Sequence, residues 1–459
     1  MVLFFLLLAN MISAIGITVV APILGIAGNI FGVDQGYAMW LMTGFMLTYV
    51  AFMPMVGRMS DVLGRKKIFI LSNAVFSVGL LLSFLTDRFG FIVFGRMVQG
   101  FGAGGILPVV NAMVVELHPG RKGKMLALVN ATYGLGMILG VNLGGVLYDR
   151  LGWRWIFVLP FLLTVISVIG CSIFLRGEGK KARERKILRI DYIGSFLFAI
   201  TVASFMMGMR NLSNHSFISP NVLSYFVITV LFGILFILRE LKTEDPMMDL
   251  RMFRRSGFTI YNLVSFFFGF SMFLIVTFFP SYIQISFGYG VSSSVYAINP
   301  FAGAMIISAM IGGIMISRIG ERKTMLFGSI LMSSFVAPFS FIQPNEFGFY
   351  IMSILLGFGL GVSMTPMNHI VIEEGGEENQ GRSAGIVSIM RSLGGIIGPT
   401  LAGFLISKID FSSFFVMDEL LRTYRKVFFM VFISTILMVV LSSIGLIMRK
   451  NPKNLKGRC

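Results

Sequence analysis

Gly57-Arg58-Met59-Ser60-Asp61-Val62-Leu63-Gly64-Arg65-Lys66-Lys67 is a short charged segment between two long apolar runs. A related segment follows about 256 residues later, as Gly313-Ile314-Met315-Ile316-Ser317-Arg318-Ile319-Gly320-Glu321-Arg322-Lys323. Each segment ends in a glycine followed closely by basic residues, and each follows a long apolar run. The pair therefore indicates that the chain contains an internal repeat.

The apolar runs dominate the composition. Of the 459 residues, 56% are hydrophobic and 13% are charged, whereas a soluble domain carries about 25% charged residues. A soluble fold of this length could not bury so much apolar surface, so we expect the solvent to be lipid.

We predict an all-α polytopic membrane protein with fourteen membrane-spanning helices. Each run has about 20 residues, enough to cross a bilayer core about 30 Å thick. The runs are continuous rather than alternating, which argues against a transmembrane barrel. The predicted spans are residues 2–27, 37–57, 67–86, 91–115, 124–147, 155–175, 191–209, 222–239, 258–281, 296–316, 324–342, 348–371, 384–407 and 427–448.

The formal net charge of +17 is explained by topology. With both termini in the cytoplasm, most Lys and Arg residues fall in the inner segments, including the basic stretch 176–189. This bias is the positive-inside rule of multi-pass proteins of the plasma (inner) membrane. The charge then contacts anionic lipids, and we expect no nucleic-acid partner because no motif supports one.

The chain offers few groups for covalent or metal chemistry. Cys171 and Cys459 are too few for a metal cluster or a disulfide framework. No phosphate-binding loop or nucleophile constellation is present. We therefore expect neither an enzyme nor a cofactor, and no metal site. The start at Met1-Val2-Leu3-Phe4-Phe5 has no basic leader, which argues against a cleaved signal peptide and leaves open a short cytoplasmic segment before it.

The repeat extends along both halves of the chain. Matching positions recur in the same order: Gly100-Phe101-Gly102 with Gly357-Phe358-Gly359, Asn111 with Asn368, Glu116 with Glu373, and Gly136, Gly140 and Gly145 with Gly394, Gly398 and Gly403. Parallel repeats of this kind build secondary transporters. We predict a six-helix bundle at 1–175, two inserted helices with charged linkers at 176–256, a second bundle at 257–448 and a tail at 449–459.

The segment Gly57–Lys67 is a candidate cytoplasmic gate formed by Gly57, Asp61, Gly64, Arg65 and Lys66. Gly57 permits close approach of another helix. Asp61 and Arg65 are predicted to form a charged clasp at the inner helix ends, where a carboxylate is favoured near a helix N-terminus. The alternative is an ordinary short basic loop.

Two arginines lie inside predicted spans. Arg96, with Gln99, lies in the fourth span, and Arg391 lies in the thirteenth. A charge within a span is costly, so both should face protein or water. They are candidates for charge coupling or substrate contact; the alternative is a structural arginine bonded to backbone carbonyls.

Glycines repeat on single helix faces of the fifth and thirteenth spans. Gly136, Gly140 and Gly144 form the first series, and Gly394 and Gly398, followed by Pro399, form the second. We expect these faces to allow tight helix packing, and Pro399 can bend its helix.

Polar residues within spans are candidates for lining a substrate cavity, although any one of them is more often a helix–helix hydrogen bond. The 47 Phe and 32 Met residues suit promiscuous apolar binding, while most of them serve core and lipid contacts. The candidates are Asn10, Asn111, Asn130, Tyr133, Asn142, Asn262, Asn299 and Asn368.

These motifs resemble a known family. Gly57–Lys67 resembles the signature loop of the major facilitator superfamily, and Arg96-Met97-Val98-Gln99-Gly100-Phe101-Gly102-Ala103 resembles its fourth-span motif. The fourteen-span drug:proton antiporter subfamily, which contains multidrug efflux transporters, is similar at Trp40-Leu41-Met42-Thr43-Gly44-Phe45, Trp153-Arg154-Trp155-Ile156-Phe157, Asp249-Leu250-Arg251-Met252-Phe253 and Arg391-Ser392-Leu393-Gly394-Gly395.

The resemblance implies two six-helix bundles that rock around a central cavity. It implies that Asp61 and Arg65 belong to the cytoplasmic gate and that Arg96 sits beside the cavity and influences proton coupling. The implied function is export of drug-like amphipathic molecules by proton antiport. Its partners would be a small-molecule substrate, protons and membrane lipids, and we expect a monomer.

The chain departs from the subfamily in its acids. Gly16 stands where the first span usually carries an acid, and Val141 replaces a proline of the fifth span. None of the 21 Asp and Glu residues is placed in the middle of a span, so the predicted cavity centre is positive. We therefore expect a neutral, zwitterionic or anionic substrate. The alternatives are an importer or facilitator of a metabolite or lipid-like anion without tight proton coupling, and a non-transporting receptor.

Overall fold

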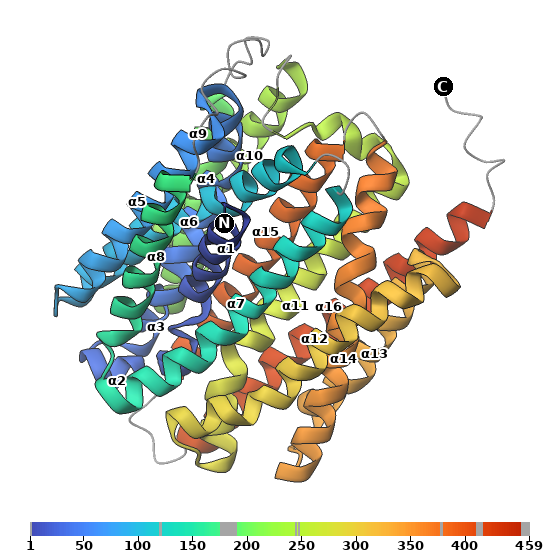
Figure 1. The fold of residues 1–459 in the computed structure, drawn as a ribbon. Helices are drawn as coiled ribbons and strands as arrows, with labels where there is room; N and C mark the ends of the chain where they lie inside the picture. The colour runs from blue at the N-terminus through green and yellow to red at the C-terminus, as the bar shows by residue number, and fades with distance from the viewer. Residues whose placement is uncertain are drawn as a thin grey trace. The chain divides into compact units, whose positions relative to one another are not determined.

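The computed structural model describes residues 2–118, 122–174, 191–243, 246, 248–376, 380–409 and 416–450. Within these residues, fourteen helical segments are long and apolar enough to cross a membrane, as predicted (Figure 1). In the first half the elements are α1 (Val2–Thr18), η1 (Ala21–Ile26), α2 (Ala27–Phe31), α3 (Gln35–Ala38), α4 (Trp40–Leu63), α5 (Arg65–Phe84), α6 (Phe89–Leu117), α7 (Lys122–Leu151) and α8 (Trp155–Phe174).

The second half continues the helical series. The inserted pair comprises α9 (Tyr192–Asn214) and α10 (Pro220–Lys242), and the later elements are η4 (Leu250–Arg254), α11 (Ser256–Phe287), α12 (Val291–Ile319), α13 (Glu321–Phe341), α14 (Glu346–Gly375), α15 (Gln380–Ser407) and α16 (Val416–Lys450).

Two spans differ from their predicted form. The first is broken: α1 ends at Thr18, and Pro22 lies in the first turn of η1, where its missing N–H prevents the preceding helix from continuing unchanged. The last begins earlier than predicted. Its first turn contains Asp418 and Glu419, and acids are favoured there because the N-terminal end of a helix is electropositive.

The first of two compact units comprises Met1–Asp249, Gly288–Tyr296 and Thr400–Asp410. In this unit α6 packs against α4 and α5, α1 packs against α7 and α8, and α9 packs against α10 and α4. The start of α12 belongs here because Ser292 N donates to Asp149 Oδ2 at 2.9 Å.

The second unit comprises Leu250–Phe287, Ala297–Pro399 and Phe411–Cys459. Here α13 packs against α14 and α16, and α11 packs against α14 and α16. These pairs correspond to α5 with α6 and α8, and to α1 with α6 and α8, in the first unit. The sequence repeat is therefore also a repeat of helix packing.

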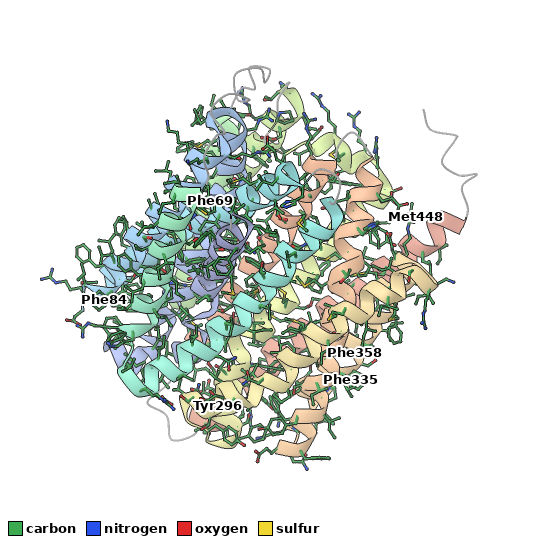
Figure 2. All side chains as sticks on the ribbon, viewed as in Figure 1. Phe69, Phe84, Tyr296, Phe335, Phe358 and Met448 are labelled. Atoms are coloured by element: carbon green, nitrogen blue, oxygen red, sulfur yellow. The ribbon has the colours of Figure 1, made fainter. Side chains whose placement is uncertain are left out.

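Large apolar side chains face outward along the helices. On α10, the side chains of Val227, Val230, Leu231 and Ile234 are each more than half exposed, and Figure 2 shows Tyr296 projecting from α12. Apolar surface of this extent is not found on a soluble monomer. It is the surface expected of helices that face lipid.

Candidate functional site

The Gly57–Lys67 segment covers the last turns of α4, the connecting Gly64 and the first residues of α5. Gly64 adopts φ +99°, a backbone conformation that residues with a Cβ atom rarely adopt. This turn places Arg65 at the first position of α5, where its Nη1 donates to Ala112 O and to Glu116 Oε2, both at 2.7 Å. Arg65 therefore ties the start of α5 to the C-terminal end of α6.

The predicted partner of Arg65 was Asp61, on the last turn of α4. The side chain of Asp61 lies outside the part of the chain that the structure describes, so the Asp61–Arg65 clasp stays a prediction. Glu116 is the partner that the sequence did not assign to Arg65. The repeat alignment did contain a signal for it, since Glu116 recurs as Glu373 near the matching helix end.

The second unit repeats the arrangement with a shift of one residue. Gly320 adopts φ +85° between α12 and α13. Arg322 forms an ion pair with Glu374, not with the aligned Glu373, and its Nη1 donates to Gly445 O at 3.0 Å. The same guanidinium lies 5.6 Å from the ring centroid of Tyr261. Each unit thus has an arginine that binds an acid on the fourth helix of its repeat.

Arg96 is held inside the first unit by three hydrogen bonds. Its side chain is fully buried and donates to Leu41 O on α4, Gly16 O on α1 and Gln99 Oε1, each at 2.7 Å. Its guanidinium lies 4.4 Å from the ring centroid of Phe45. These contacts are those of the structural alternative, an arginine that binds backbone carbonyls of neighbouring helices.

Gln99 extends this network to α5. Its Nε2 donates to Gly79 O at 3.1 Å and to Ser83 Oγ at 2.9 Å. Arg96 and Gln99 together link α1, α4, α5 and α6. The pair therefore holds these four helices of the first unit together.

The position of the missing first-span acid is occupied by a ring. A Cβ on Gly16 would lie 2.7 Å from Phe76 Cζ, and the Gly16 carbonyl already accepts a bond from Arg96. No space is left for a carboxylate unless Phe76 moves. The fixed charge of Arg96 therefore has no acid beside it at this position.

The glycine face of α7 lies against α1. Cβ atoms on Gly136 and Gly144 would overlap the carbonyl oxygens of Met11 and Val19. Thr18 Oγ1 donates to Met137 O at 2.7 Å across the same interface. The helices consequently meet backbone to backbone.

The second unit has the matching interface between α15 and α11. A Cβ on Gly394 would overlap Phe266 O, and one on Gly398 would lie 3.0 Å from Phe270 O. Pro399 follows inside α15. The buried Arg391 lies on this helix, and its own carbonyl faces Gly269 of α11.

The polar cavity candidates differ in their burial and in their hydrogen-bond partners. Asn262 is fully buried and donates to Phe258 O of its own helix, and Asn10 donates to Val129 O across the α1–α7 interface. Tyr133 lies within 3.3 Å of Tyr49, hydroxyl to hydroxyl. Asn111, Asn130, Asn142 and Asn368 are half-buried, and Asn299 is exposed.

A half-open cavity of about 280 Å³ lies in the first unit at the opposite end of α4 from Gly57. Asp34 accepts the N–H of Tyr37 at 3.1 Å, and the Lys408 ammonium lies 4.5 Å from the ring centroid of Phe404. Rings and thioethers give a deformable apolar wall, with one carboxylate at the rim. The lining includes Asp34, Tyr37, Trp40, Met206, Met209 and Phe404.

Sequence comparison gives relatives over most of the chain. It is 29% identical over 391 residues to the uncharacterized MFS-type transporter YfiU of Bacillus subtilis, covering 83% of this chain and 74% of that protein. It is 25% identical to multidrug resistance protein 3 of the same bacterium, covering 87% and 78%. The multidrug resistance protein B homolog of Mycobacterium tuberculosis is 26% identical, covering 92% and 77%.

Structural comparison supports the same fold. The crystal structure of the human organic anion transporter MFSD10 (TETRAN) superposes with a TM-score of 0.63 at 15% identity, covering 95% of this chain and 98% of that one. The Major Facilitator Superfamily profile matches residues 6–399 and 301–458. This chain is therefore a membrane transporter of the Major Facilitator Superfamily.

Proposed function

We propose that the chain exports amphipathic, drug-like small molecules across the plasma membrane, by proton antiport with rocker-switch alternating access, as a fourteen-span drug:proton antiporter. The observation that carries this proposal is the similarity to proteins named for multidrug resistance, which extends over 87% and 92% of the chain. The fourteen long apolar helices of the described residues agree with the subfamily's span number.

The helix interfaces suit a transporter that moves in rigid parts. Backbone-to-backbone packing at α1–α7 and α11–α15 has few side chains to rearrange when neighbouring helices tilt. The cavity beside Tyr37, Trp40 and Phe404 offers rings and thioethers to an amphipathic molecule at one end of the route. The deformable apolar wall favours a broad substrate range.

The charges favour neutral, zwitterionic or anionic substrates. Arg96 and Arg391 are buried within spans, and the buried acids among the described residues are Asp191 and Glu240, at the inner end of the inserted pair. In a low-dielectric interior a fixed positive charge acts over long distances. An amphipathic anion is therefore better tolerated near the spans than a cation.

A metabolite or lipid-like anion importer without tight proton coupling is the second candidate. The observation that favours it is Phe76 beside Gly16, which excludes a titratable first-span acid in this packing. A proton carrier needs a titratable group in the protein.

Export from a drug-sensitive host, with a panel of cationic, neutral and anionic dyes and antibiotics, tests the proposal. We expect uncoupler-sensitive export by the wild-type chain and its loss in Asp61→Asn, while Asp418→Asn, an exposed acid on α16, exports normally. Absence of export of any compound, from protein detected in the membrane, would shift the assignment to the metabolite transporter.

Arg391→Ala is expected to weaken export of an anionic compound more than that of a neutral one, because the buried positive charge attracts the anion. The measurement is the initial export rate of both compounds in the same cells. Arg382→Ala, an exposed arginine at the start of the same helix, is the control. Equal loss for the two compounds contradicts the positive-centre account.

A further inference from the structure

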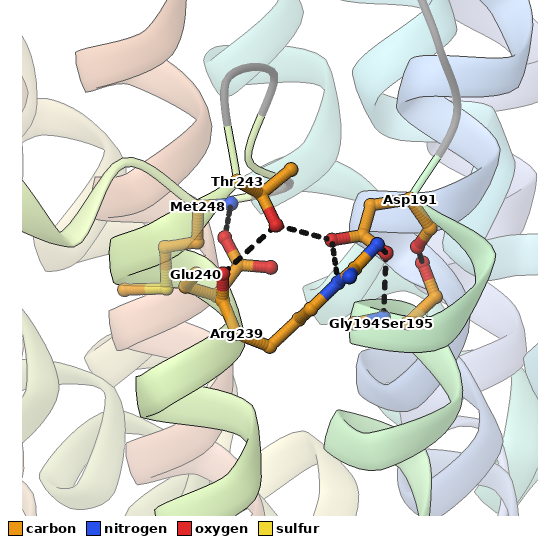
Figure 3. A network of polar contacts seen from close by, with 7 residues as sticks. All are labelled: Asp191, Gly194, Ser195, Arg239, Glu240, Thr243 and Met248. Carbon is orange, nitrogen blue, oxygen red and sulfur yellow. Dashed lines mark hydrogen bonds and ion pairs between the residues drawn. The ribbon is translucent and has the colours of Figure 1, made fainter.

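The inner end of the inserted helix pair contains a network of charged side chains (Figure 3). Asp191 precedes α9 and caps it, since its Oδ1 accepts Gly194 N at 2.8 Å. Arg239 of α10 reaches across to the same carboxylate, with Nε 3.3 Å from Oδ2 and Nη2 3.4 Å from Oδ1. Thr243 Oγ1 lies 3.5 Å from Oδ2. Asp191 therefore joins the start of α9 to the end of α10.

Glu240 connects this network to the chain that follows. Its side chain is fully buried, and its Oε2 accepts the backbone N–H of Met248 at 2.7 Å. Met248 is itself buried. A Cβ on Gly194 would lie 2.6 Å from Glu240 Oε1, so this carboxylate occupies space that only a glycine of α9 leaves open. The chain leaving α10 is thereby held to both inserted helices.

The chain changes unit directly after this contact. The division between the two units falls between Asp249 and Leu250, one residue beyond Met248. On the other side, Arg255 Nη1 donates to Gly375 O at 2.9 Å and to Glu374 O at 3.2 Å. The connection is thus bonded to α10 at Met248 and to α14 at Arg255.

We propose that Glu240 is a positioning residue for transport. It fixes the connection to the inserted pair, which packs on the first unit through α9 and α4, so the connection moves with the first unit as far as Met248. The expected effect on transport rests on the proposed function, whereas the Glu240–Met248 hydrogen bond does not. A movement of the first unit then reaches the second through a short, defined segment instead of being lost in a loose linker.

Hydrogen exchange of the purified full-length protein tests the geometry without any substrate. The Met248 amide should be protected in the wild-type protein and in Glu240→Gln, whose amide oxygen still accepts the bond. In Glu240→Ala it should exchange at least about tenfold faster, because a hydrogen bond to a charged acceptor is lost. Exchange of residues 256–259 should not change. Lys242→Ala, an exposed residue on the same helix turn, is the control.

A second pair of variants displaces Glu240 without removing it. Gly194→Ala should accelerate Met248 exchange, since its Cβ would press on Glu240 Oε1. Gly233→Ala on α10, whose Cβ would meet only Thr201 Cγ2 at 3.5 Å, should not. This pair decides the question if Glu240→Ala does not accumulate in the membrane.

The effect on transport is measured with the dye, from the panel described above, that the wild-type chain exports fastest. Glu240→Ala should lower the maximal rate at least about fivefold while the apparent KM stays within about twofold, and Glu240→Gln should restore the rate. Unchanged exchange in both Glu240→Ala and Gly194→Ala overturns the proposal, as does faster exchange with an unchanged maximal rate. If the wild-type chain exports no dye, the proposed function fails while the exchange result still decides whether Glu240 holds the connection.

Discussion

Gly144→Ala is expected to reduce export at least about fivefold, because overpacking a tight interface costs about 1–3 kcal/mol. The added Cβ would overlap the carbonyl oxygen of Val19, which belongs to the backbone and cannot rotate away. α7 would have to separate from the first span along the whole glycine face. Gly134→Ala, on the same helix with nothing within 4 Å of its Cβ, should leave export within about twofold, since alanine is the better helix former.

The second unit provides an independent copy of this experiment. Gly394→Ala would overlap Phe266 O, whereas Gly385→Ala on the same helix meets nothing within 4 Å. Thermal unfolding of the purified proteins and the initial export rate should separate the two variants in the same way. If all four alanine variants behave alike, backbone-to-backbone packing is not what these helices require.

Arg96→Ala is expected to lower the free energy of unfolding by at least about 3 kcal/mol, because two backbone carbonyls lose a charged donor and a cavity remains. Leu41 O and Gly16 O are these carbonyls, and both lie in buried surroundings. Arg96→Lys should recover only part of the loss, since an ammonium cannot reproduce the planar fork of a guanidinium.

The measurement is the amount of folded protein in the membrane together with its thermal unfolding. Arg88→Ala is the matched control, because Arg88 precedes the same helix and is exposed. Normal amounts and normal unfolding of Arg96→Ala, with loss of export alone, would instead assign Arg96 to proton coupling or substrate contact.

The fold could be predicted because bilayer thickness and the cost of unpaired backbone groups leave few choices. Run length alone predicted the fourteen long apolar helices that the described part of the chain contains. Residues 58–66, outside the predicted spans, are mostly helical, since α4 runs to Leu63 and α5 begins at Arg65, and only Gly64, with its positive φ, lies between them. The break of the first span at Pro22 was missed because the apolar run continues through it.

The candidate site was less accessible to prediction, because it depends on which helix faces meet. The Arg65–Asp61 clasp stays a prediction, and the additional partner of Arg65, Glu116, is 51 residues away in the sequence. Arg322 pairs with Glu374, although the repeat alignment matches Glu373 to Glu116. Which of the two adjacent acids on α14 faces Arg322 depends on the rotation of the helix, and an alignment of short motifs does not give that rotation. The contact of Phe76 with Gly16 and the hydrogen bond from Met248 to Glu240 likewise cannot be predicted without knowing how the helices pack.

Purified protein in liposomes, with an imposed proton gradient and simultaneous recording of substrate and proton movement, tests proton-driven export most directly. The account predicts that a compound exported by cells accumulates against its concentration gradient only when protons flow the opposite way, and that Gly144→Ala stops both fluxes. Movement of the compound only down its own gradient, at the same rate with and without the proton gradient, would contradict antiport and support the uncoupled transporter.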